Sequence, residues 1–346
     1  TAVVVLPDDF RIDVASARTE FYEYPAALPQ VEFGTVRQDL FRRDFTINAM
    51  AISLNTPHFG ELLDYFGGLE DIEGRRIMVL HELSFVDDPT RIFRAARFEQ
   101  RYGFKMSEDT EKLARRAVDL KLIRELTGVR VRDELILILS EPAPWRVLKR
   151  LEELGVLEVL HPKLKMGSDS QALFGEIGNT LVRIRKQVKE PLKAWLVYLV
   201  ALLKDLTADE VSRLTTSLRV RAEDRRVLVK AAKNASKILK ALSKDMKNSE
   251  LYLRLHDLPP EVLAYLYAAS DSMGRERIVR YFSLQDLNLE ITGDDLIKLG
   301  YKPGAMFKRV LNYVFAAKLD GRVTTREEEL SLADKTFRKL EREKAK

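Results

Sequence analysis

The order of apolar and polar residues indicates β-structure only near the start of the chain. Residues 2–6 form an apolar, β-branched run, the PDD sequence at residues 7–9 is a turn signal, and residues 10–17 alternate between apolar and polar side chains. The simplest prediction is a hairpin of two short strands. The first fifty residues are the only part of the chain in which we expect a sheet.

From about residue 85 the apolar positions recur at helical spacing almost to the C-terminus. Helices are predicted over residues 89–101, 110–117 and 131–139, and prolines separate the later helices from one another. The predicted fold is therefore α+β, with a small head of strands and helices followed by an elongated all-α part.

The composition excludes several kinds of site. The 346 residues include no cysteine, which excludes a disulfide scaffold, a thiolate metal site and a cysteine nucleophile. The four histidines are scattered, with no pair at metal-ligand spacing. The absence of cysteine fits a reducing cytoplasm, where we expect the protein. The longest fully apolar run, residues 194–203, is too short to span a bilayer, so we expect no membrane association. The net charge of +5 permits a polyanionic partner without requiring one.

The densest group of chemically capable side chains lies in the sequence RRDFTINA at residues 42–49. Arginine forks match phosphate oxygens, and a carboxylate accepts a hydrogen bond from a ribose hydroxyl. Arg42, Arg43, Asp44 and Asn48 could therefore hold a phosphorylated, hydroxylated ligand. The alternative is an ordinary Arg–Asp ion pair on the surface, at the start of a helix.

A second group, DDPTR at residues 87–91, has the pattern of a helix start, with Asp88 as the N-cap and Pro89 as the first helical residue. Arg91 then shares one helix face with Asp88. A carboxylate accepts hydrogen bonds, whereas a guanidinium only donates them. Cytosine and adenine each present an amino donor beside a ring-nitrogen acceptor, and uracil and guanine present the reverse. One Asp and one Arg could accept the first two bases and reject the others; alternatively, Asp88 is only a cap and Arg91 only its neighbour.

Four arginines continue along the same predicted helix at steps of three, three and four residues: Arg91, Arg94, Arg97 and Arg101. An arginine face of this kind suits a triphosphate or an RNA backbone. Alternatively it is a solvated face whose charges pair with Glu99 and other acids.

Two further segments concentrate positive charge. Six lysines recur at steps of three and four residues and would lie on one face of a helix: Lys230, Lys233, Lys237, Lys240, Lys244 and Lys247. This lysine stripe could follow a nucleic-acid backbone. Alternatively it is a solvated face. Near the C-terminus, a Gly/Pro turn leads into a predicted helix whose N-terminal amides could bind a phosphate. Alternatively the turn is an ordinary connection between two helices.

Asp13 lies in the second predicted strand. Two-metal phosphoryl transfer needs two or three clustered carboxylates, because Mg²⁺ prefers oxygen ligands. No DxD pair occurs on a predicted strand. Taken alone, Asp13 is most simply a solvent-exposed carboxylate.

Three segments together resemble the class II tRNA nucleotidyltransferase and bacterial poly(A) polymerase family. They are RRDFTINAMA at residues 42–51, LLDYFGGLEDIEGRRI at 62–77 and FVDDPTRIFRAARFEQRYGF at 85–104, in the order and spacing of that family. The segment ITGDDLIKLGYKPGAMF at 291–307 resembles the family's tail, so the resemblance covers most of the chain.

The resemblance implies four parts, which we place at residues 1–80, 81–140, 141–270 and 271–346. The first would be a nucleotidyltransferase head of the polymerase-β type, incomplete at its N-terminus, and the second a neck that reads the base. The third and fourth would be a helical body and a helical tail that bind tRNA at its acceptor end and TΨC side.

The same resemblance implies roles for the residues above. Asp44 would bind the ribose hydroxyl, Asp88 and Arg91 would read the base, and Asp87 would orient Arg91. The nucleotide-binding set is Arg42, Arg43, Asp44, Asn48, Asp87, Asp88, Arg91, Arg94 and Arg97. The RNA-binding set is Lys230, Lys233, Lys237, Lys240, Lys244, Lys302, Lys308 and Arg309. Asp13 would be the catalytic carboxylate that binds Mg²⁺.

The chain departs from the family pattern at two places. Asp87 stands where the family more often has Glu, one methylene longer. The family's Gly-Gly, Arg-Asp and DxD motifs do not precede residue 1, so we expect that residues 1–346 by themselves do not add nucleotides.

The implied reaction transfers a nucleoside monophosphate from ATP or CTP to the 3′-hydroxyl of tRNA and completes its CCA end, without a nucleic-acid template, by two-metal phosphoryl transfer. Residues 19–32 and 98–104 are most similar to bacterial A-adding enzymes, so the predicted subtype adds AMP, with CMP addition left open. The alternatives are a poly(A) polymerase and a truncated RNA-binding module without catalysis.

Overall fold

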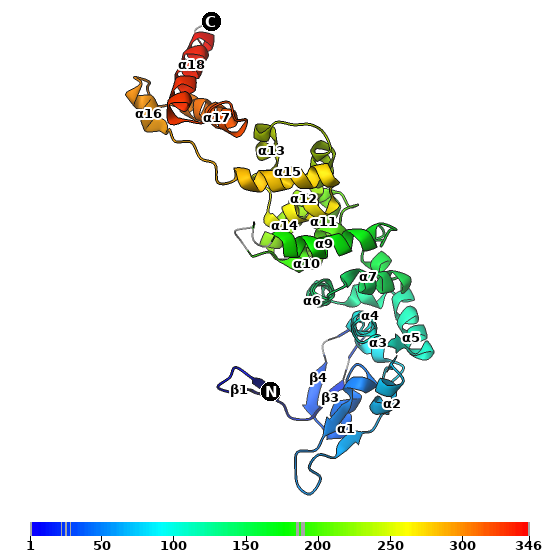
Figure 1. Ribbon diagram of the computed structural model, residues 1–346. Helices are drawn as coiled ribbons and strands as arrows, with labels where there is room; N and C mark the ends of the chain where they lie inside the picture. The colour runs from blue at the N-terminus through cyan, green and yellow to red at the C-terminus, as the bar shows by residue number, and fades with distance from the viewer. Residues whose placement is uncertain are drawn as a thin grey trace. The chain divides into compact units, whose positions relative to one another are not determined.

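The structure is a computed structural model that describes residues 2–21, 23, 24, 26, 27, 29–184, 187 and 191–344. Figure 1 draws the chain coloured by residue number. The chain divides into two compact units. The first unit comprises residues 1–175 and 202–225, and the second comprises residues 176–201 and 226–346.

The strands of the described chain are short and pair two by two. β1 (Ala2–Val5) pairs with β2 (Arg11–Val14), β3 (Arg18–Phe21) with β4 (Gln30–Phe33), and β5 (Met50–Ile52) with β6 (Leu62–Asp64), all antiparallel, whereas β7 (Arg76–Ile77) and β8 (Lys105–Met106) are parallel.

The predicted hairpin near the start of the chain is confirmed, with Val3 opposite Asp13. The prediction that sheet is confined to the first fifty residues is wrong, because β6, β7 and β8 lie beyond them. Pairings of two or three residues are too short to leave an alternating pattern in the sequence.

Helices make up the rest of the first unit. They are α1 (Val36–Phe41), η1 (Thr46–Asn48), α2 (Gly68–Glu73), α3 (Ser84–Asp87), α4 (Thr90–Tyr102), α5 (Glu108–Asp119), η2 (Leu122–Glu125), α6 (Gly128–Leu139), α7 (Pro144–Glu153), α8 (Val156–Leu160) and α11 (Ala208–Ser217). The three helices predicted from the sequence correspond to α4, α5 and α6, and are confirmed.

Helix α4 is the centre of the first unit. It packs against α3, α6 and α7, and Ile92, Phe93 and Ala96 on it are completely buried. It ends at Gly103, whose φ of 68° is the left-handed conformation that closes a helix and that glycine adopts without steric cost. Because one face of α4 is core, its other side chains are held in fixed directions.

The second unit is helical throughout its described residues. Its helices are α9 (Ser170–Ile184), α10 (Ala194–Leu202), α12 (Ala222–Leu242), α13 (Asn248–Leu255), α14 (Pro260–Ala269), α15 (Ser272–Leu284), α16 (Gly293–Lys298), α17 (Ala305–Leu319) and α18 (Arg326–Lys344), of which α9, α10 and α12 include residues of both units. Pro144 and Pro260 are the first residues of α7 and α14, so these two prolines separate helices as predicted.

The described helices do not include one with the length and apolarity needed to cross a bilayer. The division into head, neck, body and tail at residues 80, 140 and 270 stays a prediction, since the two compact units divide the chain differently.

A buried ion pair holds the C-terminal helices together. Glu329 on α18 is completely buried. Its Oε1 lies 2.6 Å from Lys318 Nζ on α17, and its Oε2 accepts hydrogen bonds from the backbone N–H groups of Glu290 and Ile291. The hydrogen bond to Glu329 raises the pKa of Lys318. One carboxylate thus ties two helices and the segment before α16 around an apolar cluster.

We expect Glu329→Ala to lower the free energy of unfolding by about 3–5 kcal/mol, because it leaves Lys318 and two amide groups without their buried partner. Urea denaturation followed by circular dichroism measures the change. Glu327→Ala, on the same helix but exposed, is the control and should cost less than about 1 kcal/mol. Equal losses in the two variants would contradict the role assigned to Glu329.

Candidate functional site

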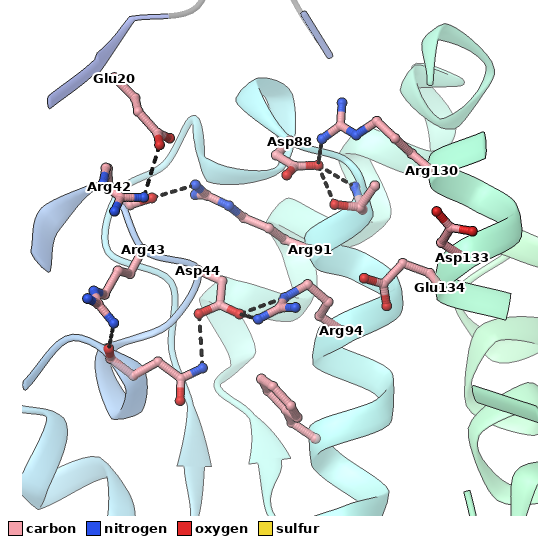
Figure 2. A pocket seen from close by; sticks show the side chains of 13 residues that line it. Glu20, Arg42, Arg43, Asp44, Asp88, Arg91, Arg94, Arg130, Asp133 and Glu134 are labelled. Atoms are coloured by element: carbon pink, nitrogen blue, oxygen red, sulfur yellow. Dashed lines mark hydrogen bonds and ion pairs between the residues drawn. The ribbon is translucent and has the colours of Figure 1, made fainter. Parts of the chain in front are cut away.

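A polar cavity of about 790 Å³ lies in the first unit and gathers most of the predicted nucleotide-binding residues (Figure 2). Its walls come from β3, the turn after α1, the start of α4 and the first half of α6. The lining residues are Glu20, Arg42, Arg43, Asp44, Asn48, Asp88, Thr90, Arg91, Arg94, Phe98, Arg130, Asp133 and Glu134.

Asp44 is buried in the wall of this cavity and all its acceptor positions are used. Its Oδ1 accepts from the N–H of Phe45 and from Asn48 Nδ2, both at 3.0 Å. Its Oδ2 accepts from Arg94 Nε at 2.8 Å and lies 2.6 Å from Arg94 Nη2. The short turn η1 brings Asn48 back to Asp44, and α4 supplies Arg94. A ribose hydroxyl at Asp44 must therefore replace one of these donors.

Arg42 and Arg43 are paired with carboxylates other than Asp44. Arg42 binds Glu20 and Asp39, each at 2.9 Å, and Arg43 binds Asp39 at 3.2 Å. Burial acts to raise the pKa of Asp39, but hydrogen bonds from Arg42, from the N–H of Arg18 and from Arg43 together lower it. The ion pairs proposed as the alternative for this segment therefore exist, although Asp39 and Glu20 make them, and both guanidiniums still line the cavity.

Asp88 precedes α4 and presents one carboxylate oxygen to the cavity. The sequence predicts Asp88 as the N-cap and Pro89 as the first helical residue; α4 instead begins at Thr90, with Pro89 as its N-cap. The capping contact is kept, because Asp88 Oδ1 accepts from the N–H of Thr90 at 2.9 Å. Oδ1 also accepts from Thr90 Oγ1, and it lies 2.7 Å from Arg130 Nη2. Oδ2 has no hydrogen-bond partner among the described residues.

Arg91 is buried and joins the start of α4 to the turn after α1. Its Nη1 donates to Ser84 Oγ at 2.6 Å, and its Nη2 donates to the backbone carbonyl of Arg42 at 2.7 Å. Of the five N–H groups of a guanidinium, these bonds use two. Asp88 and Arg91 both line the cavity, and their role as a base-reading pair stays a prediction.

Asp87 faces a different neighbour from the one predicted. Its Oδ2 lies 3.9 Å from Nε2 of His81, and no hydrogen bond joins Asp87 to Arg91 in the described part of the chain. Burial raises the pKa of Asp87 and lowers the pKa of His81. The orienting role of Asp87 toward Arg91 stays a prediction.

The arginine face of α4 divides between two environments. Arg94 binds Asp44 inside the cavity. Arg97 is buried outside the lining, 3.6 Å from Glu134 and 3.8 Å from Glu141, and Arg101 binds Glu141 at 2.9 Å. The role of Arg97 in nucleotide binding therefore stays a prediction.

Glu99 does not pair with this arginine face. It is buried and binds Arg150 on α7, with its Oε2 2.8 Å from Arg150 Nε, and it accepts from the N–H of Met106. The alternative given for this arginine face, pairing with Glu99 and other acids, therefore holds for Asp44, Glu134 and Glu141 but not for Glu99. Glu99 lies on the side of α4 that packs against α7.

The sequence analysis missed four charged lining residues: Glu20, Arg130, Asp133 and Glu134. Three of them lie in the sequence RVRDE at the start of α6, a dense run of charge on a helix with an apolar face, which was the available signal. Glu134 is buried, and its burial raises its pKa despite the neighbouring Arg97.

Asp13 lies on β2 with its side chain exposed, as the residue alone suggested. No three His, Asp or Glu side chains in the described part of the chain could hold a metal ion together. The described residues therefore do not form a two-metal centre, and the metal-binding role of Asp13 stays a prediction.

The lysine stripe is only partly helical. Helix α12 ends at Leu242, so Lys244 and Lys247 lie beyond it, and the prediction of six lysines on one helix is wrong for these two. The sequence SKDMKN at residues 243–248 has only Met246 as an apolar position to continue the helix face. Lys230 donates to the backbone carbonyl of Asp257.

The outer part of the stripe is unpaired. Lys233, Lys237 and Lys240 are exposed on α12 and make no ion pair within the described chain. Lys302 before α17, and Lys308 and Arg309 near the start of α17, are likewise exposed. Their roles in RNA binding stay predictions.

Comparison with known proteins gives the same family as the motifs. A family model of the poly A polymerase head domain matches residues 1–78, and one of a probable RNA and SrmB-binding site of polymerase A matches residues 103–166. An A-adding tRNA nucleotidyltransferase of Geobacter sulfurreducens is 39% identical over 96% of this chain, and one of Halalkalibacterium halodurans is 31% identical over 97%.

Solved structures agree with these relatives. An apo CCA-adding enzyme has a TM-score of 0.84 and 34% identity, and covers 95% of this chain and 78% of its own. The Thermotoga maritima CCA-adding enzyme complexed with tRNA has a TM-score of 0.78 and 31% identity, and covers 96% and 77%. The chain therefore belongs to the tRNA nucleotidyltransferase and poly(A) polymerase family, which is an enzyme family.

The relatives differ greatly in length. The chain spans 77% of the Halalkalibacterium enzyme but only 39% of the Geobacter enzyme. An A-adding relative from Aquifex aeolicus matches over 43% of this chain, which is 18% of that relative.

We expect the stability of the first unit to depend on pH through Glu134. Its folded pKa lies above the ordinary value of 4.5 because it is buried, so the folded state holds the proton more tightly than the unfolded state. Stability contributed by this proton is present below pH 4.5 and is lost as the pH rises through the higher folded pKa. Relative to wild type, Glu134→Gln should gain stability across that window.

Urea denaturation at a series of pH values from 4 to 8 measures the difference between the two proteins. Glu158→Gln, which removes an exposed carboxylate on α8, is the control for the loss of a surface charge. A difference between wild type and Glu134→Gln that does not change with pH would show that burial does not act on Glu134.

Proposed function

We propose that this chain is the nucleotide-selecting and tRNA-binding part of an A-adding tRNA nucleotidyltransferase. The observation that carries the proposal is the cavity in which the phosphate- and ribose-binding candidates Arg42, Arg43 and Asp44 meet the base-reading candidates Asp88 and Arg91. The relatives named A-adding enzymes support the choice of subtype.

The chemistry of the cavity suits a nucleoside triphosphate. Arg42, Arg43 and Arg94 line the cavity and provide donors for phosphate oxygens, in the fork geometry that phosphate favours. In the same cavity, Asp88 Oδ2 can accept from the amino group of adenine or cytosine, and the N–H groups of Arg91 that are not bonded to Ser84 or Arg42 can donate to the adjacent ring nitrogen. Uracil and guanine would place a carbonyl against the carboxylate.

The transfer reaction itself is proposed from the family. AMP would pass from ATP to the tRNA 3′-hydroxyl with release of pyrophosphate. The family implies a divalent metal ion in this reaction, and Mg²⁺ as that ion stays a prediction. Two further statements also stay predictions: the cytoplasmic location, and the inactivity of residues 1–346 by themselves. Structural relatives solved with ATP, with CTP and with tRNA are CCA-adding enzymes, so addition of CMP is the second candidate.

We expect the chain to bind ATP and CTP at least about tenfold more tightly than UTP and GTP, since a tenfold ratio needs only about 1.4 kcal/mol. Isothermal titration calorimetry with each triphosphate measures the four affinities. With a tRNA ending in CC present, the A-adding subtype predicts that ATP binds more tightly than CTP.

Each alternative function predicts another outcome. Equal binding of tRNA and unrelated RNA, with ATP preferred on both, would favour a poly(A) polymerase. RNA binding without nucleotide binding would favour the RNA-binding module.

We expect the unpaired lysines of α12 to carry part of the tRNA affinity. Changing Lys233, Lys237 and Lys240 to Gln should weaken tRNA binding and reduce the slope of log Kd against log salt concentration by about 2–3, the value for three phosphate contacts. Filter binding at several salt concentrations measures both quantities.

A control set carries the same change of charge. Lys112, Lys149 and Lys204 pair with carboxylates of their own chain, so their change to Gln should leave the slope nearly as in wild type. An unchanged slope in the α12 variant would mean that these lysines are only a solvated face.

A further inference from the structure

We propose that Arg130 is a positioning residue that fixes the base-reading carboxylate of Asp88 and thereby sets nucleotide selectivity. The inference rests on the proposed function, since it concerns how the same cavity distinguishes bases. Arg130 lies in the first turn of α6, opposite the start of α4, and Figure 2 shows its guanidinium directed at Asp88.

The contacts of Asp88 are divided unequally between its two oxygens. Oδ1 accepts from the N–H and the hydroxyl of Thr90 and lies 2.7 Å from Arg130 Nη2. Oδ2 has no partner in the described chain. A carboxylate whose one oxygen is saturated by three donors must present the other oxygen to an incoming ligand.

Two residues donate to Asp88 Oδ1, Thr90 and Arg130, and of these only Arg130 lies outside the turn that contains Asp88. Thr90 is two positions from Asp88 and moves with the same turn. Arg130 comes from another helix, and its Nη1 also donates to the backbone carbonyl of Ala26 at 3.1 Å. The torsion of an aspartate carboxylate is broad, so a donor fixed from a second element limits which oxygen faces the cavity.

The packing of α6 does not depend on this contact. Val131, Leu135 and Ile138 are buried on α6, and α4 and α6 pack against each other along this face. At the helix start, Gly128 lies so close to the backbone of Ser217 that an added Cβ would clash at 1.8 Å. Arg130 itself remains partly exposed, with 21% of its side-chain surface accessible. Its polar contacts therefore go to the site and the segment beside it.

The expected consequence concerns selectivity more than affinity. If Arg130 is removed, the Asp88 carboxylate can rotate, and Oδ2 no longer meets the base amino group in one fixed direction. Arg42 and Arg43, the proposed phosphate contacts, pair with Glu20 and Asp39 and make no contact with Asp88 or Arg130 in the described chain. All four triphosphates should still bind, but adenine and cytosine should lose their advantage.

The test compares Arg130→Met with wild type in equilibrium binding of ATP, CTP, UTP and GTP. We expect the ratio of affinities for ATP and CTP over UTP and GTP to fall about tenfold, which corresponds to about 1.4 kcal/mol. Arg130→Lys should restore part of the ratio, because an ammonium can still donate to Asp88 Oδ1. Arg130→Lys keeps the aliphatic part of the side chain. If Arg130→Met does not fold, Arg130→Lys therefore provides the comparison with wild type, and its ratio should lie below the wild-type ratio.

Arg132→Met is the matched control. Arg132 lies on the same helix and makes polar contacts to Asp133 and to the backbone carbonyl of Arg219. It does not line the cavity. The ratio should stay as in wild type, which separates the effect of losing a contact to Asp88 from that of losing any arginine of α6.

A double-mutant cycle tests whether Arg130 acts through Asp88. In the Asp88→Asn background, Arg130→Met should cause no further loss of selectivity. Equal weakening of all four nucleotides by Arg130→Met, or a full further loss in the Asp88→Asn background, would overturn the proposal. A wild-type chain that binds all four triphosphates equally, or none, would instead overturn the proposed function.

Discussion

The pairing of buried carboxylates with arginines is the constraint on which the cavity depends. A buried charge needs a partner of opposite sign and hydrogen bonds for its remaining positions. Asp44 is buried and satisfied only because α4 supplies Arg94 and η1 supplies Asn48. The ion pair between Asp44 and Arg94 also joins the turn after α1 to α4. The polar wall of the cavity is thus also a structural link between two parts of the first unit.

The links around the cavity run between segments that are distant in the sequence. Arg91 donates to the backbone of Arg42, and Arg130 contacts Asp88, so the turn after α1, the start of α4 and the start of α6 are joined through side chains. Such links hold polar groups at fixed positions before a ligand arrives, which reduces the ordering that binding must impose. If the chain has the proposed function, its selectivity among bases depends on these fixed positions.

The positive charge of the chain is used in two ways. In the cavity, Arg42, Arg43 and Arg94 are paired with carboxylates of their own chain, and an incoming phosphate must compete for them. On α12, the exposed lysines have no ion-pair partner within the described residues. An unpaired, solvated lysine suits contact with the phosphates of a nucleic-acid backbone, which carry no sequence information. The same net charge of +5 therefore describes two chemically different surfaces.

The sequence by itself determined the local elements and the family. The hairpin near the start and helices α4 to α6 followed from periodicity, and the motifs around Asp44 and Asp88 named most of the charged residues that line one cavity. Only the tertiary structure decided which charges meet: Asp39 and Glu20 neutralise Arg42, Glu99 turns to Arg150, and Arg130 reaches Asp88 from another helix. Periodicity depends on neighbours three or four residues apart. Of these pairings, only Asp39–Arg42 lies within that distance, whereas Glu20–Arg42, Asp88–Arg130 and Glu99–Arg150 join residues 22 to 51 positions apart. Their choice depends on how α1, α4, α6 and α7 pack.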